Sequence, residues 1–233
     1  MDDPYSVNQS MRHRIGTVLL VVGLGVLAWA ATVYLWKDPF TTVYTTYEQR
    51  RLERSLDKQF QQWRPAREPA AAPTESTKLA DVSGQARRYR LARKDGDAIA
   101  RLVIPRLNLN AIVVNGTSVE DLRRGPGRHL ETYMPGEGKL VYIAGHRTTW
   151  AAPFSHIDDM RPGDRIFVRL PYASFTYQVV GHRIVDDNDL SVLKTGRREQ
   201  LVLQACNPRF FATQRYLVYA RPVSIVPRSR GGA

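Results

Sequence analysis

The pattern of apolar and polar residues changes from one segment of the chain to the next. The first segment is an uninterrupted apolar run. Residues 15–36 (IGTVLLVVGLGVLAWAATVYLW) contain no charged side chain. As a helix, this run would span roughly 33 Å, enough to cross a bilayer core of about 30 Å. Trp29, Tyr34 and Trp36 lie near its end, where aromatic residues suit a membrane interface. The run predicts an uncleaved transmembrane anchor. A cleaved signal peptide is the alternative, but its apolar core is usually shorter, at ~7–15 residues.

The charges beside this run predict its orientation. Arg12 and Arg14 precede it, whereas Lys37 follows it and further arginines come later. Basic residues next to a spanning helix favour the cytoplasmic side, and a short N-terminal tail precedes a long C-terminal region. We predict a cytoplasmic tail over residues 1–14 and a single-pass type II cell-membrane protein, with the C-terminal domain extracellular.

The next pattern is helical. Between residues 44 and 63, the apolar residues Leu52, Leu56, Phe60 and Trp63 recur every three or four positions among charged residues. This spacing predicts a juxtamembrane amphipathic helix over residues 41–64, whose apolar stripe packs on the following domain or on a partner helix, with the domain favoured. Residues 65–97 begin with several prolines and show no usable periodicity, so we predict a flexible linker there.

From about residue 98 the pattern becomes that of short strands. Turn signals such as Asn115-Gly116 and residues 161–164 separate them. We expect short helices at 118–124, where Ser118 and Asp121 resemble a capping box, and at 154–160. The predicted strands are 99–104, 109–114, 139–144, 165–170, 175–185, 199–205 and 216–226. Seven or eight short strands with few helices predict one mainly β domain, a barrel or a sandwich, over residues 98–228.

The net charge of the chain limits the classes of molecule that it could bind. The chain has 34 Lys and Arg against 22 Asp and Glu, a net charge of +12. The excess is spread out, its clearest cluster lies between residues 87 and 94, and we find no aromatic-interleaved basic stripe or nucleic-acid motif. An anionic membrane or envelope polymer therefore fits better than nucleic acid as the partner of this charge.

Three chemically active residues stand at the ends of apolar runs. Cys206, the only cysteine, ends one run, His146 follows a second, and Arg215 begins a third. A thiolate can attack a carbonyl, an imidazole can move protons, and a guanidinium can stabilise developing negative charge. A lone cysteine is more often a small buried hydrophobe, but here the strand gives way to a loop at Asn207 and Pro208, and nearby arginines favour the thiolate.

His146 has rivals among the other histidines. Gly145 before it permits a close backbone approach at a strand end. His182 is predicted mid-strand and His13 lies in the tail, whereas His129 and His156 remain open on chemistry alone. Several aspartates could orient the imidazole, although a solvated loop face is favoured for each of them: Asp158, Asp159, Asp186, Asp187 and Asp189. No histidine pair has metal-ligand spacing and Cys206 has no second cysteine, so we predict no metal site.

Four ordered blocks resemble the sortases, the membrane-anchored cysteine transpeptidases of Gram-positive bacteria, and within them the class E group of actinobacteria. The blocks are NGTSVEDLRRGPG (115–127), AGHRTTWAAPF (144–154), RPGD (161–164) and LSVL (190–193). The resemblance covers about residues 98–226. It departs from the family pattern at Ala205, where a threonine usually precedes the cysteine, at Asn207, where class E often has histidine, and mildly at Trp150, where tyrosine is common.

This resemblance implies a fold and a mechanism. The fold would be a sortase-like closed β-barrel preceded by the anchor and the juxtamembrane helix. Cys206 would cleave a C-terminal LPXTG- or LAXTG-like sorting signal of a secreted protein between Thr and Gly through a thioacyl intermediate, His146 would transfer protons, and Arg215 would stabilise the oxyanion or fix the peptide. The acceptor would be an amine of a peptidoglycan precursor or a pilin lysine, and no metal or organic cofactor would be needed.

Two other functions stay open. A hydrolytic thiol peptidase would use the same Cys206 and His146 with water as acceptor. A catalytically weak envelope binding module would keep the fold without a reactive thiol, and Ala205 would then mark the decay of activity.

Overall fold

The computed structural model describes residues 4–35, 39–64 and 75–228. The chain divides into two compact units, residues 1–39 and 40–233. The first unit is the helix α1 (Pro4–Leu35). Its segment Met11–Ala31 is long and apolar enough to cross a membrane, a test that a signal sequence near an N-terminus also passes. Trp36, at the end of the predicted span, lies outside the described residues.

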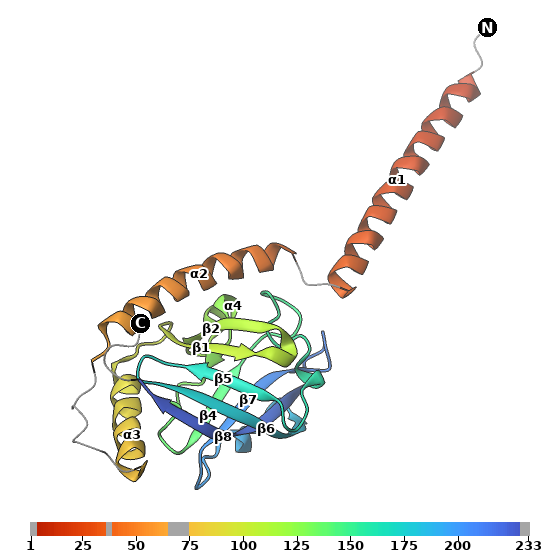
Figure 1. Cartoon of the computed structure of the whole chain (residues 1–233). Coiled ribbons are helices and arrows are strands. Elements are labelled where there is room, and N and C mark those ends of the chain that lie inside the picture. Colours follow the sequence, from red (N-terminus) through yellow and green to blue (C-terminus); the bar gives the residue numbers. More distant parts are fainter. Residues whose placement is uncertain (1–3, 36–38, 65–74, 229–233) are drawn as a thin grey trace. The chain divides into compact units, whose positions relative to one another are not determined.

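The second unit is built on a closed barrel of eight strands in the order β1-β2-β3-β4-β7-β8-β6-β5 (Figure 1). The strands are β1 (Ala98–Ile104), β2 (Leu109–Asn115), β3 (Gly127–Arg128), β4 (Leu140–Ala144), β5 (Arg165–Arg169), β6 (Ala173–Asp186), β7 (Gln200–Asn207) and β8 (Gln214–Pro227). The prediction of a mainly β closed barrel is confirmed. The sequence reading missed only β3, because two residues carry no alternation.

Alternation along β7 and β8 separates an inner and an outer face of the barrel wall. Leu201, Leu203 and Ala205 belong to the main core inside the barrel. Val202 and Leu217 face outward and form a second cluster with residues of neighbouring strands. We call this second cluster the outer patch; it comprises Leu140, Tyr142, Val185, Val202 and Leu217, with Val192, Leu193 and Tyr219 packed against it.

The helix α2 (Pro39–Gln62) packs on the barrel wall through its apolar stripe. Its Leu52 and Leu56 are buried against Ala98, Ile112 and Val114 of β1 and β2. Figure 1 shows α2 running beside β1, β2 and the short helix α4 (Val119–Arg124). Because a fully buried leucine contributes about 1.5–3 kcal/mol, these two residues fix the helix on the domain.

The predicted flexible linker over residues 65–97 does not hold for residues 75–92, which form the helix α3 (Glu75–Ala92). Val82, Ala86 and Tyr89 of α3 are buried in the main core. These three residues recur at helical spacings of four and three, but Ala86 is small and the other large apolar residues of the helix, Leu79 and Leu91, are exposed, so the stripe is weak in the sequence. The helix is stabilised by its tertiary contacts rather than by strong amphipathicity.

Short helices and 3₁₀ turns occupy the connections between the strands. The predicted capping box is confirmed: the Ser118 hydroxyl accepts from the Asp121 amide, and the Asp121 carboxylate accepts from the Ser118 amide. The stretch predicted as a helix at 154–160 contains only the 3₁₀ turn η2 (Ile157–Asp159). Two further 3₁₀ turns are η1 (Pro105–Leu107) and η3 (Leu190–Leu193), the latter between β6 and β7.

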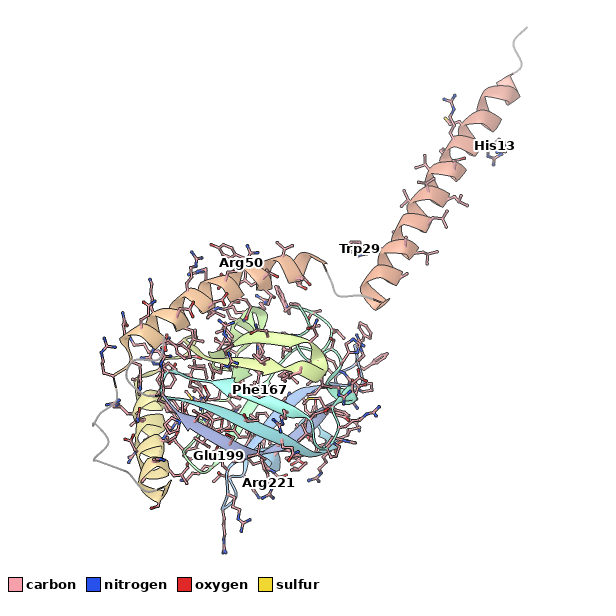
Figure 2. The ribbon with its side chains drawn as sticks, viewed as in Figure 1. His13, Trp29, Arg50, Phe167, Glu199 and Arg221 are labelled. Atoms are coloured by element: carbon pink, nitrogen blue, oxygen red, sulfur yellow. The ribbon has the colours of Figure 1, made fainter. Side chains whose placement is uncertain are left out.

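A buried carboxylate, Glu199, holds the loop that leads into β4 (Figure 2). It accepts hydrogen bonds from the amides of Gly136 and Gly138, at 2.9 and 3.0 Å, and from the Tyr177 hydroxyl at 2.6 Å. Burial raises the pKa of Glu199, and these donors oppose that effect. The side chain thus ties the entry to β4 to β6 and to the start of β7.

Candidate active site

Strand pairing places Arg215 directly opposite Cys206. β7 lies between β4 and β8 in the barrel, and Cys206 of β7 pairs with Arg215 of antiparallel β8. Residues directly opposite in an antiparallel pair point to the same face, with Cβ atoms about 4.5–5.5 Å apart. The thiol and the base of the guanidinium side chain are therefore neighbours on one face.

The parallel pairing of β4 with β7 brings His146 to the same end of the barrel. Ala144 is in register with Gln204, and the Gly145 amide donates to the Gln204 carbonyl at 3.0 Å. His146 follows at once, so it leaves β4 beside the part of β7 that carries Cys206. The three residues predicted from sequence thus lie at the same end of three adjacent strands: Cys206 on β7, Arg215 on β8 and His146 just after β4.

The turn at His146 requires a glycine before it. A Cβ atom on Gly145 would lie 2.7 Å from the ring of Phe154, which is fully buried. The Phe154 amide also donates to the His146 carbonyl at 3.1 Å, closing the loop between them. Close packing, rather than an unusual backbone angle, explains Gly145.

Cys206 is free and partly exposed, on the outer face of the wall. Its neighbour Ala205 points into the core and is fully buried, so the departure from the family's threonine lies inside the barrel. On the outer side, Gln204 accepts from the Tyr142 hydroxyl at 2.9 Å, and the outer patch continues along the strands. The sulfur is therefore accessible on the outer side of the wall rather than sealed in the main core.

His146 is held largely out of water. Burial, and secondarily the positive charge of Arg123, lower its pKa. Its Nε2 atom is buried and has no hydrogen-bond partner among the described residues. The imidazole is therefore neutral near pH 7, because its ordinary pKa of about 6.5 is already below that pH.

Arg215 aims its guanidinium at the connection between β7 and β8. Its Nη1 donates to the carbonyls of Ala212 and Gln214, at 2.7 and 2.9 Å. Its Nη2 lies 4.0 Å from Asp187, whose side chain is half exposed. These contacts fix the arginine at the edge of the site.

The aspartates considered as partners of the imidazole bind other groups. Asp158 pairs with Arg147 at 2.8 Å and Asp159 lies 3.6 Å from His156. Asp189 accepts from the Ser191 amide at 3.0 Å and caps η3. The rival histidine His182 is exposed and stacks on Tyr216. Among the described residues, no group of three or more His, Cys, Asp or Glu could hold a metal ion.

Sequence reasoning assigned no role to Arg147, which links the two sides of the site. This buried arginine donates through Nη1 to the Cys206 carbonyl at 3.2 Å and to Asn207 Oδ1 at 2.9 Å. Nη2 pairs with Asp158. The residue after the histidine thereby binds the backbone of the cysteine. The block at 144–154 contains Arg147, but no local pattern shows what a buried arginine contacts.

We expect Arg147→Met to loosen the site without removing any reacting group. Losing the bonds to the Cys206 carbonyl and Asn207 should lower the free energy of unfolding by about 1–3 kcal/mol. It should lower kcat about tenfold, since a 1.4 kcal/mol rise in the barrier has that effect. Denaturant unfolding and peptide-transfer kinetics measure both. Asp158→Asn is the matched control: it removes the charge of a half-exposed carboxylate but leaves an amide oxygen that can accept from the buried Arg147, so its loss should be smaller, and an equal loss there would contradict the role of the backbone bonds.

Comparisons with known proteins identify the family of the chain. A sortase domain family model matches residues 102–223. Sortase D of Bacillus subtilis is 31% identical over 160 residues, covering 66% of this chain and 79% of that protein. Sortase SrtE1 of Streptomyces coelicolor is 29% identical over 185 residues, covering 72% of this chain but only 53% of that protein's length.

A solved structure extends the likeness to three dimensions. Sortase E1 from Streptomyces coelicolor superposes with a TM-score of 0.54 at 29% identity, covering 59% of this chain and 95% of that one. The fold, the family model and the relatives together define a cysteine transpeptidase. The chain belongs to the sortase family.

Proposed function

We propose that this sortase cleaves a C-terminal sorting signal of the LPXTG or LAXTG type between Thr and Gly and joins the new Thr carboxyl end to an amine. The observation that carries the proposal is the strand pairing, with Cys206 between the strand leading to His146 and the strand that begins near Arg215. The Streptomyces coelicolor sortase E1 structure, which holds a tripeptide in its active site, supports a peptide substrate.

The proposed reaction proceeds in two transfers. The Cys206 thiolate attacks the threonine carbonyl, and Arg215 stabilises the developing oxyanion. His146, neutral at rest, accepts the proton of the Cys206 thiol as the thiolate forms, and donates that proton to the departing glycine amine as the C–N bond breaks, leaving a thioester. An incoming amine attacks the thioester, His146 accepts a proton from it, and the thiol is released. Cys206 itself is partly exposed, so an extended peptide can reach the sulfur from the outer side of β7.

We further propose that α1 anchors the enzyme in the cell membrane with the barrel outside the cell. The apolar segment Met11–Ala31 and the arginines before it support this topology. The substrates would then be secreted proteins that carry a sorting signal. The acceptors would be peptidoglycan precursors or pilin lysines, which meet the enzyme near the membrane surface.

Mass spectrometry of the full chain in detergent, with a fluorogenic sorting peptide and triglycine, tests this function. A thioacyl adduct on Cys206 and a peptide spliced to triglycine are expected. Cleaved peptide without spliced product, even at high triglycine concentration, would indicate a hydrolytic peptidase instead. Unmodified Cys206 and intact peptide across a panel of signals would leave only a binding module.

Arg215→Ala is expected to lower kcat/KM about 10²–10³-fold, the range found when an oxyanion donor is removed. Arg215→Lys should recover little, because a lysine cannot reproduce the planar fork of a guanidinium. Arg221→Ala, an exposed change further along β8 (Figure 2), is the matched control and should stay near the parent rate. Equal rates for Arg215→Ala and Arg221→Ala would show that Arg215 does not stabilise the oxyanion.

A further inference from the structure

The first turns of α2 contact the loop that follows His146. The Trp150 amide donates to Thr41 Oγ1 at 3.0 Å. The Trp150 ring meets Tyr44 edge to face, with centroids 5.6 Å apart and planes inclined at 75°. A helix that precedes the barrel in sequence thus binds both the backbone and the ring of one residue in the histidine loop.

The helix α4 completes this contact from a second side. The Arg123 guanidinium lies over the Trp150 ring, 5.0 Å from its centroid. Glu120 joins the two helices, because it accepts from the Tyr44 hydroxyl and from Arg123, each at 3.2 Å. The Thr45 hydroxyl also donates to the Arg123 carbonyl at 2.8 Å. Trp150 is therefore held between two helices that are bonded to each other.

The backbone of the loop needs such support. Trp150, Ala151 and Ala152 have φ values of 54°, 59° and 41°, in the left-handed region that non-glycine residues rarely adopt. Conformations of this kind persist where the surroundings hold them, and they gather near functional sites. The loop is also closed on the candidate proton-transfer residue, since the Phe154 amide donates to the His146 carbonyl. A shift of the Trp150 turn would consequently move His146.

We propose that Thr41 and Tyr44 are positioning residues, so that α2 holds the Trp150 turn and thereby sets the place of His146 beside Cys206. This inference rests on the proposed function, in which His146 transfers the protons. It makes the helix that follows the apolar segment a part of the catalytic unit. A barrel separated from residues 1–64 would keep Cys206, His146 and Arg215 but lose the support of the histidine loop.

The pKa of His146 provides a second measure of whether α2 holds the Trp150 turn. The two causes of its lowered pKa are burial and the charge of Arg123, and Arg123 stacks on the same Trp150 ring that α2 holds. Releasing Trp150 from α2 should admit water to the imidazole and free Arg123 to move away. Both changes would raise the pKa of His146 towards its ordinary value.

The test compares variants of the full chain in detergent micelles. Tyr44→Ala and Thr41→Val are expected to lower kcat at least about fivefold with KM changed less than about twofold, because they disturb the placement of a reacting group and not the peptide surface. Tyr44→Phe keeps the ring contact with Trp150 and should retain most of the rate. Tyr47→Ala is the matched control, since this tyrosine lies on the same helix and is 60% exposed.

An NMR titration of the His146 ring in the same full-length variants provides a readout that does not depend on turnover. Its pKa should rise in Tyr44→Ala and Thr41→Val and stay at the parent value in Tyr47→Ala. Parent-like kcat and parent-like pKa in both α2 variants would overturn the inference. If the parent chain fails to transfer peptide, only the proposed function is contradicted. The titration still tests whether α2 positions His146 through Trp150. Thr41→Val, which removes one hydroxyl, keeps the test open if Tyr44→Ala does not fold.

Discussion

Cys206→Ala is expected to abolish transfer, with kcat/KM at least about 10³-fold below the parent and no thioacyl adduct in the mass spectrum. No other cysteine occurs in the chain, so no second thiol can take over the attack. Loss of a nucleophile in an acyl-transfer enzyme removes the covalent pathway and leaves only what binding and the oxyanion site contribute. Peptide-transfer kinetics with intact-mass analysis measure both effects.

The control for Cys206→Ala is a measurement of its melting temperature, which shows whether the variant still folds. Cys206 lies on the outer face and is partly exposed, and the neighbouring core residue Ala205 is untouched, so the melting temperature should change little. Cys206→Ser, which keeps the shape with a poorer nucleophile, should be nearly as inactive. Substantial transfer by a well-folded Cys206→Ala chain would refute the mechanism.

His146→Gln is expected to lower kcat/KM by about 10²–10⁴-fold, the usual contribution of a positioned general acid and base. Glutamine retains a hydrogen-bonding side chain of similar reach but cannot exchange protons. His156→Gln is the matched control, because His156 lies in the same loop, is exposed and pairs only loosely with Asp159. Equal activity of the two variants would show that His146 is not the proton-transfer group.

The same substitution changes how stability depends on pH. Burial lowers the pKa of His146 in the folded state, so the unfolded chain takes up a proton there more readily as the pH falls through about 6.5. His146 therefore costs stability below that pH. Between about pH 7 and pH 5 the parent should lose more melting temperature than His146→Gln does. An identical loss in both would show that the imidazole is not held out of water.

The alternation of apolar and polar residues in the sequence predicted most of the fold, because side chains on a strand point alternately to its two faces. The seven longer strands, the apolar segment and the Ser118 capping box all follow from neighbouring residues. The helix α3 was missed because its stability depends on residues that are distant in sequence. Its Tyr89 is buried by contacts with Trp63 and Tyr172, which stand far from it in sequence. No window around residues 75–92 contains those partners.

The candidate site divides in the same way. The sequence by itself determined the chemistry: one thiol, an imidazole after a glycine and a guanidinium at a strand start, in the order of the sortase blocks. Only the tertiary structure decided that β4 runs parallel to β7 in the register that brings His146 to the end of β7 that carries Cys206. It also decided that Arg147 binds the Cys206 backbone and that α2 binds the loop after His146. The physical reason is that strand register and side-chain contacts between distant segments depend on how the whole barrel closes, whereas residue type and local period do not.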